Sequence, residues 1–129
     1  MNIGAASAAS GVSAKMIRHY EATGLLRPAP RRKNSYRDYG ASEVHELHFI
    51  ARARKLGFSI REIGDLLALW RDRNRPSREV RQIATAHLAD LETRVAELQT
   101  MASALRKLVR GCHGDDRPDC PILDELGSP

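Results

Sequence analysis

The residues best suited to chemistry are two cysteines near the carboxyl end of the chain. Cys112 and Cys120 are the whole supply of thiols, and they close the stretch CHGDDRPDC, which is rich in turn-forming residues. A cysteine pair at such a spacing is typical of a structural disulfide, a redox pair or a metal clamp. Which of these applies depends on the donors nearby and on the elements that position the stretch.

The donor set of this stretch favours a soft ion with few ligands. A structural zinc site needs four ligands and an iron–sulfur cluster four cysteines, so both are disfavoured. Two thiolates suit a singly charged d10 ion that accepts near-linear coordination, which is Cu(I) or, by the same chemistry, Ag(I) or Au(I). His113 adjoins Cys112, and a third donor would spoil that geometry. The acidic residues are hard donors that serve better as turn formers: Asp115, Asp116 and Asp119.

Two thiolates around one monovalent cation leave a net negative charge that the protein must offset. Cys120 directly precedes PILDEL, a predicted short helix with Pro121 at its first position. The positive end of that helix would favour the Cys120 thiolate. Cys112 and Cys120 are therefore predicted metal ligands, and a Cys112–Cys120 disulfide that senses oxidants is the alternative.

No stretch approaches the roughly 20 apolar residues of a membrane span. The start, MNIGAASAASG, has neither the charged region nor the apolar run of a signal peptide. We therefore expect a cytoplasmic protein with no membrane partner, and in that compartment an isolated structural disulfide is improbable.

The net charge of +5 is concentrated in the first third of the chain. Residues 1–40 hold seven Lys or Arg against two acidic residues, whereas the other 89 residues hold 14 of each sign. Basic charge gathered at one end predicts a polyanionic partner, most simply nucleic acid.

The same region has the pattern of a helix-turn-helix. Asn2 and Ser13 are suitable N-caps for helices over 3–10 and 14–22, which Gly11 and Gly24 end. The second helix has one polar face, formed by Lys15, Arg18 and His19. Its other face, with Met16, Ile17 and Tyr20, is predicted to turn towards a core.

A basic hairpin is predicted next, over RPAPRRKNSYRDYG. Asn34-Ser35 offers the turn, 31–33 forms one basic arm, and the alternation from Tyr36 to Tyr39 is typical of a strand. A hairpin beside a helix-turn-helix is a wing, on which Arg31 and Arg37 would meet phosphates.

Two more helices follow. Ser42 is predicted to cap one that runs to about Lys55, and Ser59 caps another over 60–70 with Glu62 in a capping box. We expect their apolar faces to form the core rather than a ligand pocket. The residues concerned are Leu47, Phe49, Ile50, Ala51, Arg54, Phe58, Ile63, Leu66, Leu67 and Trp70.

From Pro76 to Arg110 the sequence predicts one uninterrupted helix of roughly 50 Å, at ~1.5 Å per residue. Two heptad positions are apolar throughout: Leu88, Val95, Ala102 and Val109 form one, and Ala84, Leu91, Leu98 and Leu105 the other. Since only 19 residues follow the helix, a dimeric coiled coil covers this stripe better than an intramolecular partner. A two-fold dimer of winged helices would match two DNA half-sites.

The sequence thus predicts a mainly α fold in three parts. A winged helix-turn-helix DNA-binding domain occupies 1–70, a linker and coiled-coil dimerisation helix 71–110, and a metal-binding loop, short helix and tail 111–129. The histidines are scattered, and neither a nucleophile–base pair nor a Gly-rich phosphate loop is present, so we do not expect an enzyme.

The stretches IRHYEATGLL, NSYRDY and the closing Cys-x7-Cys-Pro-Ile-Leu resemble the MerR family of bacterial transcription regulators. The likeness covers almost the whole chain and is greatest for the copper-efflux regulators of the CueR/HmrR type. It implies an antiparallel coiled-coil dimer on double-stranded promoter DNA, with a metal-bound form that distorts the DNA so that RNA polymerase engages. The first helix departs from the family in its GAASAAS run.

The resemblance also implies roles for single residues. Arg18 and Arg37 would contact phosphates, with Lys15, Tyr20 and Tyr36 near the DNA, although both tyrosines have an equal alternative role in the small core. Family members that sense divalent ions carry a cysteine where this chain has Ser77, which favours the two-coordinate site, although a polar residue of the first helical turn is an equal alternative role for Ser77. By similarity Arg81 would help to neutralise the loop. The resulting hypothesis is a Cu(I)-responsive activator of a copper-efflux gene.

Overall fold

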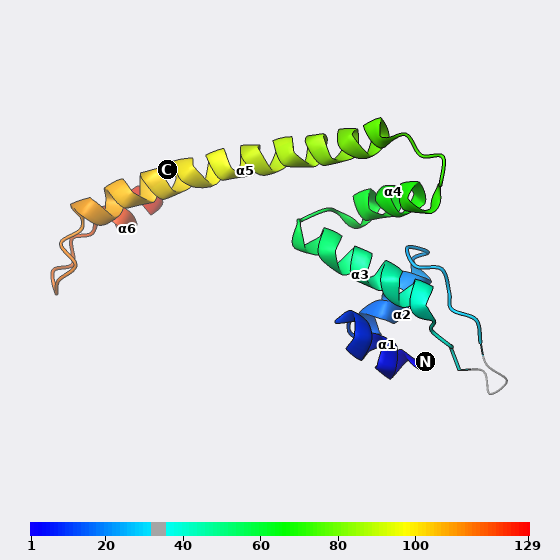
Figure 1. Cartoon of the computed structure of the whole chain (residues 1–129). Helices are drawn as coiled ribbons and strands as arrows, with labels where there is room; N and C mark the ends of the chain where they lie inside the picture. The colour runs from blue at the N-terminus through cyan, green and yellow to red at the C-terminus, as the bar shows by residue number, and fades with distance from the viewer. Residues whose placement is uncertain (32–35) are drawn as a thin grey trace. The chain divides into compact units, whose positions relative to one another are not determined.

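The computed structural model describes residues 1–31 and 36–129, and over these ranges it is built from helices (Figure 1). The described helices are α1 (Ile3–Ser10), α2 (Ala14–Ala22), α3 (Ala41–Lys55), α4 (Ile60–Arg71), α5 (Ser77–Gly111) and α6 (Pro121–Leu126). The chain divides into two compact units, residues 1–83 and 84–129. Within the described ranges no helix combines the length and apolarity that crossing a membrane requires.

The first two helices have the predicted bounds because local capping fixes them. The Asn2 side chain accepts a hydrogen bond from the Ala5 N–H, and Ser13 accepts one from Met16. Gly11 ends α1 in the left-handed region, at φ 76°. The helix-turn-helix prediction is therefore confirmed in its geometry.

The cap of α3 differs from the prediction. The N-cap is Gly40, whose N–H donates to Glu43 Oε2 at 2.9 Å, and Ser42 lies inside the helix. The helix begins where an acidic side chain three residues on can satisfy a free backbone N–H. For α4, Ser59 and Glu62 form the predicted capping box.

The core lies in the unit 1–83 and is mostly aliphatic. Its buried apolar residues come from α1 to α4 and the segments between them: Ala6, Val12, Ile17, Tyr20, Leu25, Leu26, Ala29, Tyr39, Leu47, Ile50, Ala53, Ile63 and Leu67. Ala51 and Leu66 are half-buried. Two predicted core residues lie outside it, since Arg54 is exposed and Trp70 keeps 44% of its surface.

The wing contains less regular structure than predicted. Among the described residues the pairing is a single antiparallel bridge between Arg31 and Arg37, with no strand on either side. An Asp38 N–H to Pro30 carbonyl hydrogen bond of 2.8 Å continues the same pairing. The predicted turn at Asn34-Ser35 and the basic residues Arg32 and Lys33 lie outside the described residues.

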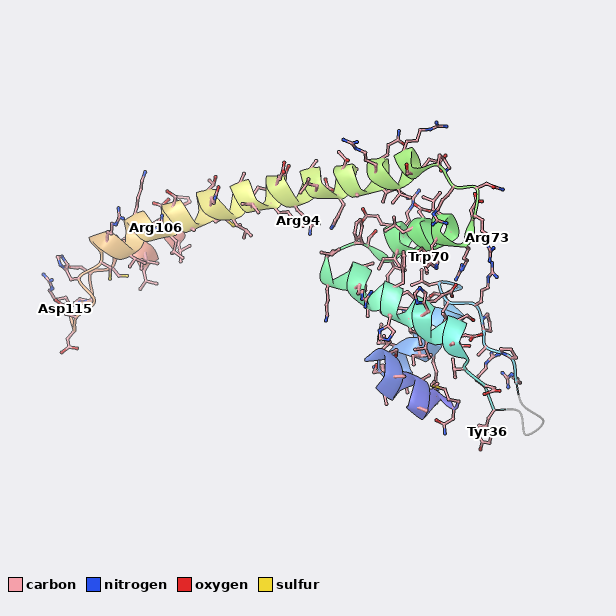
Figure 2. All side chains as sticks on the ribbon, viewed as in Figure 1. Tyr36, Trp70, Arg73, Arg94, Arg106 and Asp115 are labelled. Carbon is pink, nitrogen blue, oxygen red and sulfur yellow. The ribbon has the colours of Figure 1, made fainter. Side chains whose placement is uncertain are left out.

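The unit 84–129 holds most of α5, the cysteine loop and α6. The start of α6 packs beside the end of α5, where Gly111 faces the Pro121 ring. A Cβ atom added to Gly111 would lie 3.6 Å from that ring. The apolar stripe of α5 is open, with Leu88, Val95 and Leu98 each more than half exposed. Figure 2 shows the side chains along the same helix, with Arg94 and Arg106 labelled.

Candidate functional site

Helix α2 has the two faces that its sequence predicts. Lys15, Arg18 and His19 are exposed, whereas Ile17 is fully buried. Tyr20 is also in the core and keeps 4% of its surface, which supports its alternative role there, while its DNA contact stays a prediction. The exposed face carries the cations, as an approach to DNA requires.

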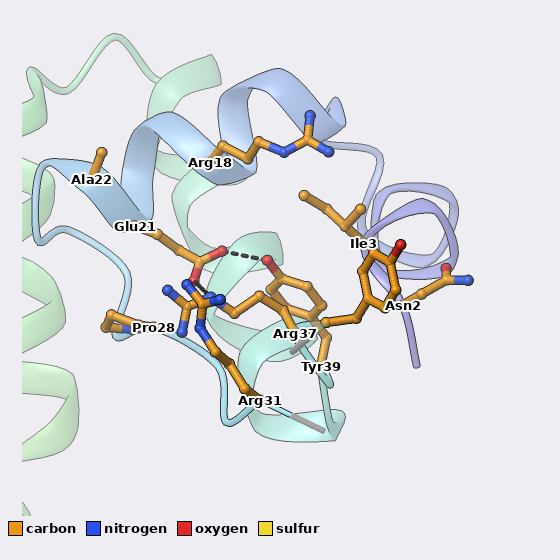
Figure 3. A pocket seen from close by; sticks show the side chains of 10 residues that line it. Asn2, Ile3, Arg18, Glu21, Ala22, Pro28, Arg31, Arg37 and Tyr39 are labelled. Carbon is orange, nitrogen blue, oxygen red and sulfur yellow. Dashed lines mark hydrogen bonds and ion pairs between the residues drawn. The ribbon is translucent and has the colours of Figure 1, made fainter. Parts of the chain in front are cut away.

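A pocket of about 440 Å³ lies between α2, α1 and the wing (Figure 3). It gathers Arg18, Arg31, Tyr36 and Arg37, four of the predicted DNA-binding residues. Lys15 and His19 are absent from the described lining and stay on the outer face of α2. Tyr36 is 71% exposed, so its alternative role in the core is wrong.

One acidic residue of this pocket was missed from the sequence. Glu21, near the end of α2, has a side chain that is only 8% exposed. Its carboxylate accepts hydrogen bonds from the Tyr39 hydroxyl and, at 3.3 Å, from the Ala29 N–H. Its Oε2 lies 3.5 Å from Arg37 Nε (Figure 3). These partners come from the wing and from the segment before it, so only the tertiary structure brings them together.

Glu21 also affects the pKa of the Tyr39 hydroxyl. Burial is the main cause that raises the pKa of the Tyr39 hydroxyl, and the hydrogen bond and negative charge of Glu21 raise it further. Arg37, besides facing Glu21, donates from Nη1 to the Ala29 carbonyl at 2.9 Å. Arg37 is therefore held on two sides before any DNA arrives.

The two cysteines come together as their spacing predicts. Cys112 Sγ and Cys120 Sγ lie 3.9 Å apart, and both residues are half-buried free thiols. A disulfide would need about 2.05 Å, and a metal–sulfur bond is about 2.3 Å long. The sulfurs are therefore too far apart for a bond between them and close enough for one ion to reach both.

The backbone between the cysteines makes this approach possible. Cys112 follows the last turn of α5, and its N–H donates to the Val109 carbonyl at 3.1 Å. Gly114 turns the chain with φ at 65°, a conformation that other residues rarely adopt. Cys120 then occupies the N-cap of α6 in an extended conformation.

The start of α6 acts on the Cys120 thiol without forming a regular capping hydrogen bond. The N–H groups of Leu123 and, less strongly, Ile122 lower the pKa of the Cys120 thiol, while desolvation opposes this shift. The thiolate, which is the form that binds metals, is thus favoured at this position.

The donor set around the cysteines is small. Across residues 1–31 and 36–129, no group of three or more His, Cys, Asp or Glu side chains could hold a metal ion together. Asp115 is instead engaged by Arg117, whose Nε lies 2.9 Å from Asp115 Oδ2, and this bond lowers the pKa of the Asp115 carboxyl. Among the described residues, the two thiols are therefore the donors that the loop brings together.

Ser77 and Arg81 lie on the first turns of α5, and both are exposed. They belong to the unit 1–83, whereas both cysteines belong to 84–129. The predicted influence of Ser77 and Arg81 on the metal site stays a prediction.

Phe49 and Phe58 pack against the core as expected, but together with Trp70 they also line a surface pocket of about 450 Å³. The rings of His45 and Trp70 stack there with centroids 5.4 Å apart. The prediction that Phe49 and Phe58 pack against the core is confirmed, and the exposed ring of Trp70 adds a surface hollow beside them that the sequence did not indicate.

Two protein-family models match this chain. Residues 1–70 match the family described as "MerR HTH family regulatory protein", and residues 44–108 match "MerR, DNA binding". The chain belongs to the MerR family. This confirms both the resemblance seen in the sequence and the mainly helical, helix-turn-helix fold class.

Individual relatives of this MerR-family chain cover nearly all of it. Heavy metal-dependent transcription regulator 2 of Rhizobium meliloti is 56% identical over 99% of this chain and 87% of the relative. The transcriptional regulator CueR of Salmonella typhimurium is 39% identical over 98% of this chain and 91% of its own length. These relatives are transcription regulators, so the chain is not an enzyme, as expected.

The fold has a close counterpart among solved structures. The transcription regulator PbrR691 of Ralstonia metallidurans CH34, crystallised with lead(II), gives a TM-score of 0.86 at 30% identity. The likeness covers 98% of each chain. The MerR fold of this chain therefore extends through the long helix and the carboxyl-terminal loop.

Proposed function

We propose that this MerR-family chain is a Cu(I)-responsive transcription activator of a copper-efflux gene, with Ag(I) and Au(I) as alternative signals. The observation that carries the proposal is that Cys112 Sγ and Cys120 Sγ lie 3.9 Å apart. Among the described residues, no third His, Cys, Asp or Glu side chain joins them in a group that could hold a metal ion. A bound soft ion would tie the two ends of the loop together through two thiolates. The heavy metal-dependent relatives support a metal signal in general.

The DNA partner is proposed to be duplex promoter DNA. The pocket that gathers Arg18, Arg31 and Arg37, together with Lys15 and His19 on the outer face of α2, supports phosphate contacts from this side. Because promoter DNA is the proposed partner, we also propose that the protein is cytoplasmic.

The protein is proposed to act as a homodimer. The stripe on α5 leaves Val95, Leu98 and Leu105 more than half exposed in one chain, and a second copy of the stripe would cover it as an antiparallel coiled coil. A two-fold dimer would place two copies of the basic pocket on one promoter. Activation would follow a shift of the dimer between two DNA-bound shapes, the metal-bound one distorting the promoter so that RNA polymerase engages.

Transcription from the copper-exporter promoter of the source organism tests the proposal. The Cys112→Ser variant is expected to lose induction by copper and to keep its affinity for DNA. The matched control is His113→Ser, which changes the neighbouring exposed residue and leaves both thiols in place. Copper induction retained by Cys112→Ser would rule the site out.

A thiol-redox regulator is the second candidate, because the same two half-buried thiols need to move only from 3.9 Å to about 2.05 Å to form a disulfide. Counting free thiols before and after exposure to air, with and without Cu(I), separates the two. A redox regulator forms the disulfide readily and ignores the metal.

A divalent soft ion is the remaining alternative, since a structural relative was crystallised with lead(II). Anaerobic titration with Cu(I) and Pb(II) in competition with chelators compares them directly. The proposal expects Cu(I) to be bound and Pb(II) to be bound more weakly.

A further inference from the structure

Glu21 is an acid in the basic pocket that is proposed to meet DNA phosphates. A buried carboxylate is costly unless it is paired and hydrogen-bonded. It also repels phosphates, so an acid at this position weakens DNA binding by simple electrostatics. Its presence there needs a compensating role.

The contacts of Glu21 join three segments of the unit. The residue itself is on α2, the Ala29 N–H that it accepts belongs to the segment after that helix, and Tyr39 and Arg37 belong to the wing. The carboxylate is therefore one of two points that fasten the wing to the helix-turn-helix, the other being Met1, whose amino group donates to Asp38 Oδ1 at 2.8 Å and to the Tyr39 carbonyl at 2.6 Å.

Arg37 is the cation that these contacts orient. Its Nε faces Glu21 Oε2 at 3.5 Å, and its Nη1 donates to the Ala29 carbonyl at 2.9 Å. With a third of its side chain exposed, Arg37 still lines the pocket. Fixing a guanidinium in advance reduces the conformational entropy that is lost when it binds a phosphate.

We propose that Glu21 is a positioning residue for DNA binding, which holds Arg37 and the wing against α2 in the geometry that receives a phosphate. This inference rests on the proposed DNA-binding function. It also predicts the direction in which DNA affinity changes when Glu21 is replaced. Removal of the negative charge of Glu21 should weaken binding, although electrostatics alone would strengthen it.

The test compares Glu21→Gln with Glu46→Gln in the full-length protein. Glu46 makes a similar partly buried ion pair, with Arg71 Nε 2.7 Å from Glu46 Oε1. Glu46 is not among the described residues that line the basic pocket, so Glu46→Gln removes the same charge away from the proposed DNA contacts. The probe is a labelled duplex that the wild-type protein selects from a random-sequence library. Affinity is measured by fluorescence anisotropy at several salt concentrations.

We expect Glu21→Gln to bind this duplex about tenfold more weakly, the scale of one charge-assisted hydrogen bond. The slope of log affinity against log salt concentration should also fall by about one unit, as for one lost phosphate contact. Glu46→Gln should bind within about twofold of the wild type. In an Arg37→Ala background, Glu21→Gln should cause a smaller loss than in the wild type, because only the contacts of Glu21 with Tyr39 and Ala29 remain to be lost.

Tyr39→Phe keeps the test informative if Glu21→Gln fails to fold, which thermal melting would reveal. Phe keeps the buried ring and removes only the hydroxyl that donates to Glu21, so we expect binding about threefold weaker. Wild-type affinity or better in the folded variants would overturn the role of Glu21 while leaving the proposed function intact. A wild-type protein that selects no duplex at all would overturn the proposed function as well.

Discussion

The two units of the molecule differ in where they place their apolar side chains. Residues 1–83 enclose a core in which Ile17, Leu47 and Leu67 have no exposed surface. In residues 84–129, all of which the structure describes, the buried residue is His87, and the large apolar side chains of α5 lie open. The first unit encloses its own apolar core, whereas the second leaves an apolar stripe open, which the proposed dimer would cover.

The chemistry of the two units differs in a similar way. The basic pocket uses arginines whose positions depend on contacts between distant segments, such as Glu21 with Tyr39. The cysteine site depends on one short loop that leads from the end of α5 into α6. DNA binding should therefore be sensitive to packing, and metal binding to two residues above all.

The largest expected effect comes from a charge placed on the open stripe. Leu98→Glu should raise the dimer dissociation constant at least 100-fold, because each copy loses the burial of a leucine, worth about 1.5–3 kcal/mol. Sedimentation over a range of concentrations measures this. Thr100→Glu puts the same charge on another side of the helix and should leave the dimer intact. A monomeric wild-type protein would remove the basis of this comparison between the units.

A side-chain truncation in the core of the first unit should lower the free energy of unfolding by the same amount at any protein concentration. Leu47→Ala, at a fully buried position, is expected to lower the free energy of unfolding by about 2–5 kcal/mol. Chemical denaturation at two protein concentrations checks this. The loss should be equal at both, whereas a loss that changes with concentration would show that this unit also depends on its partner.

Arg18→Ala and Arg31→Ala remove cations from the basic pocket. Each should weaken DNA binding about tenfold and almost uniformly across sequences, with the salt slope reduced by about one unit. Copper binding should stay at the wild-type level, since the cysteines lie in the other unit. An unchanged salt slope would mean that the pocket does not face the phosphates.

The smallest effect concerns the protonation of Cys120. Because the N–H groups of Leu123 and Ile122 lower the pKa of its thiol, alkylation of Cys120 should set in at lower pH than in an unstructured RPDCPIL peptide. Mass spectrometry after timed iodoacetamide treatment at several pH values gives both profiles. The sign follows from the lowered pKa, since the thiolate persists to more acidic pH in the folded chain. Coincident profiles would contradict the influence of α6.

Local signals in the sequence predicted most of the fold. Caps such as Ser13 and Ser59 act within one turn, so the bounds of α2 and α4 follow from the sequence itself. Ser42 misled the prediction because Glu43, three residues after Gly40, accepts a hydrogen bond from the Gly40 N–H and so lets the helix begin at Gly40 instead. That spacing was visible in the sequence and is the signal that could have found the cap.

Properties that depend on packing between segments were harder to predict. Helical periodicity places Trp70 on an apolar face but does not show that this face extends beyond the core, where Trp70 stays 44% exposed. The role of Glu21 has no local signal, because its partners lie 8 to 18 residues away. The cysteine pair was accessible from the sequence because a single turning loop brings the sulfurs together.

X-ray absorption at the copper edge, on the full-length protein loaded anaerobically with Cu(I), tests the central claim most directly. We predict that the spectrum fits two sulfur neighbours and no nitrogen or oxygen ligand, with one copper bound per chain. A four-coordinate centre, nitrogen or oxygen ligands, or a protein that retains no copper after desalting would contradict the account.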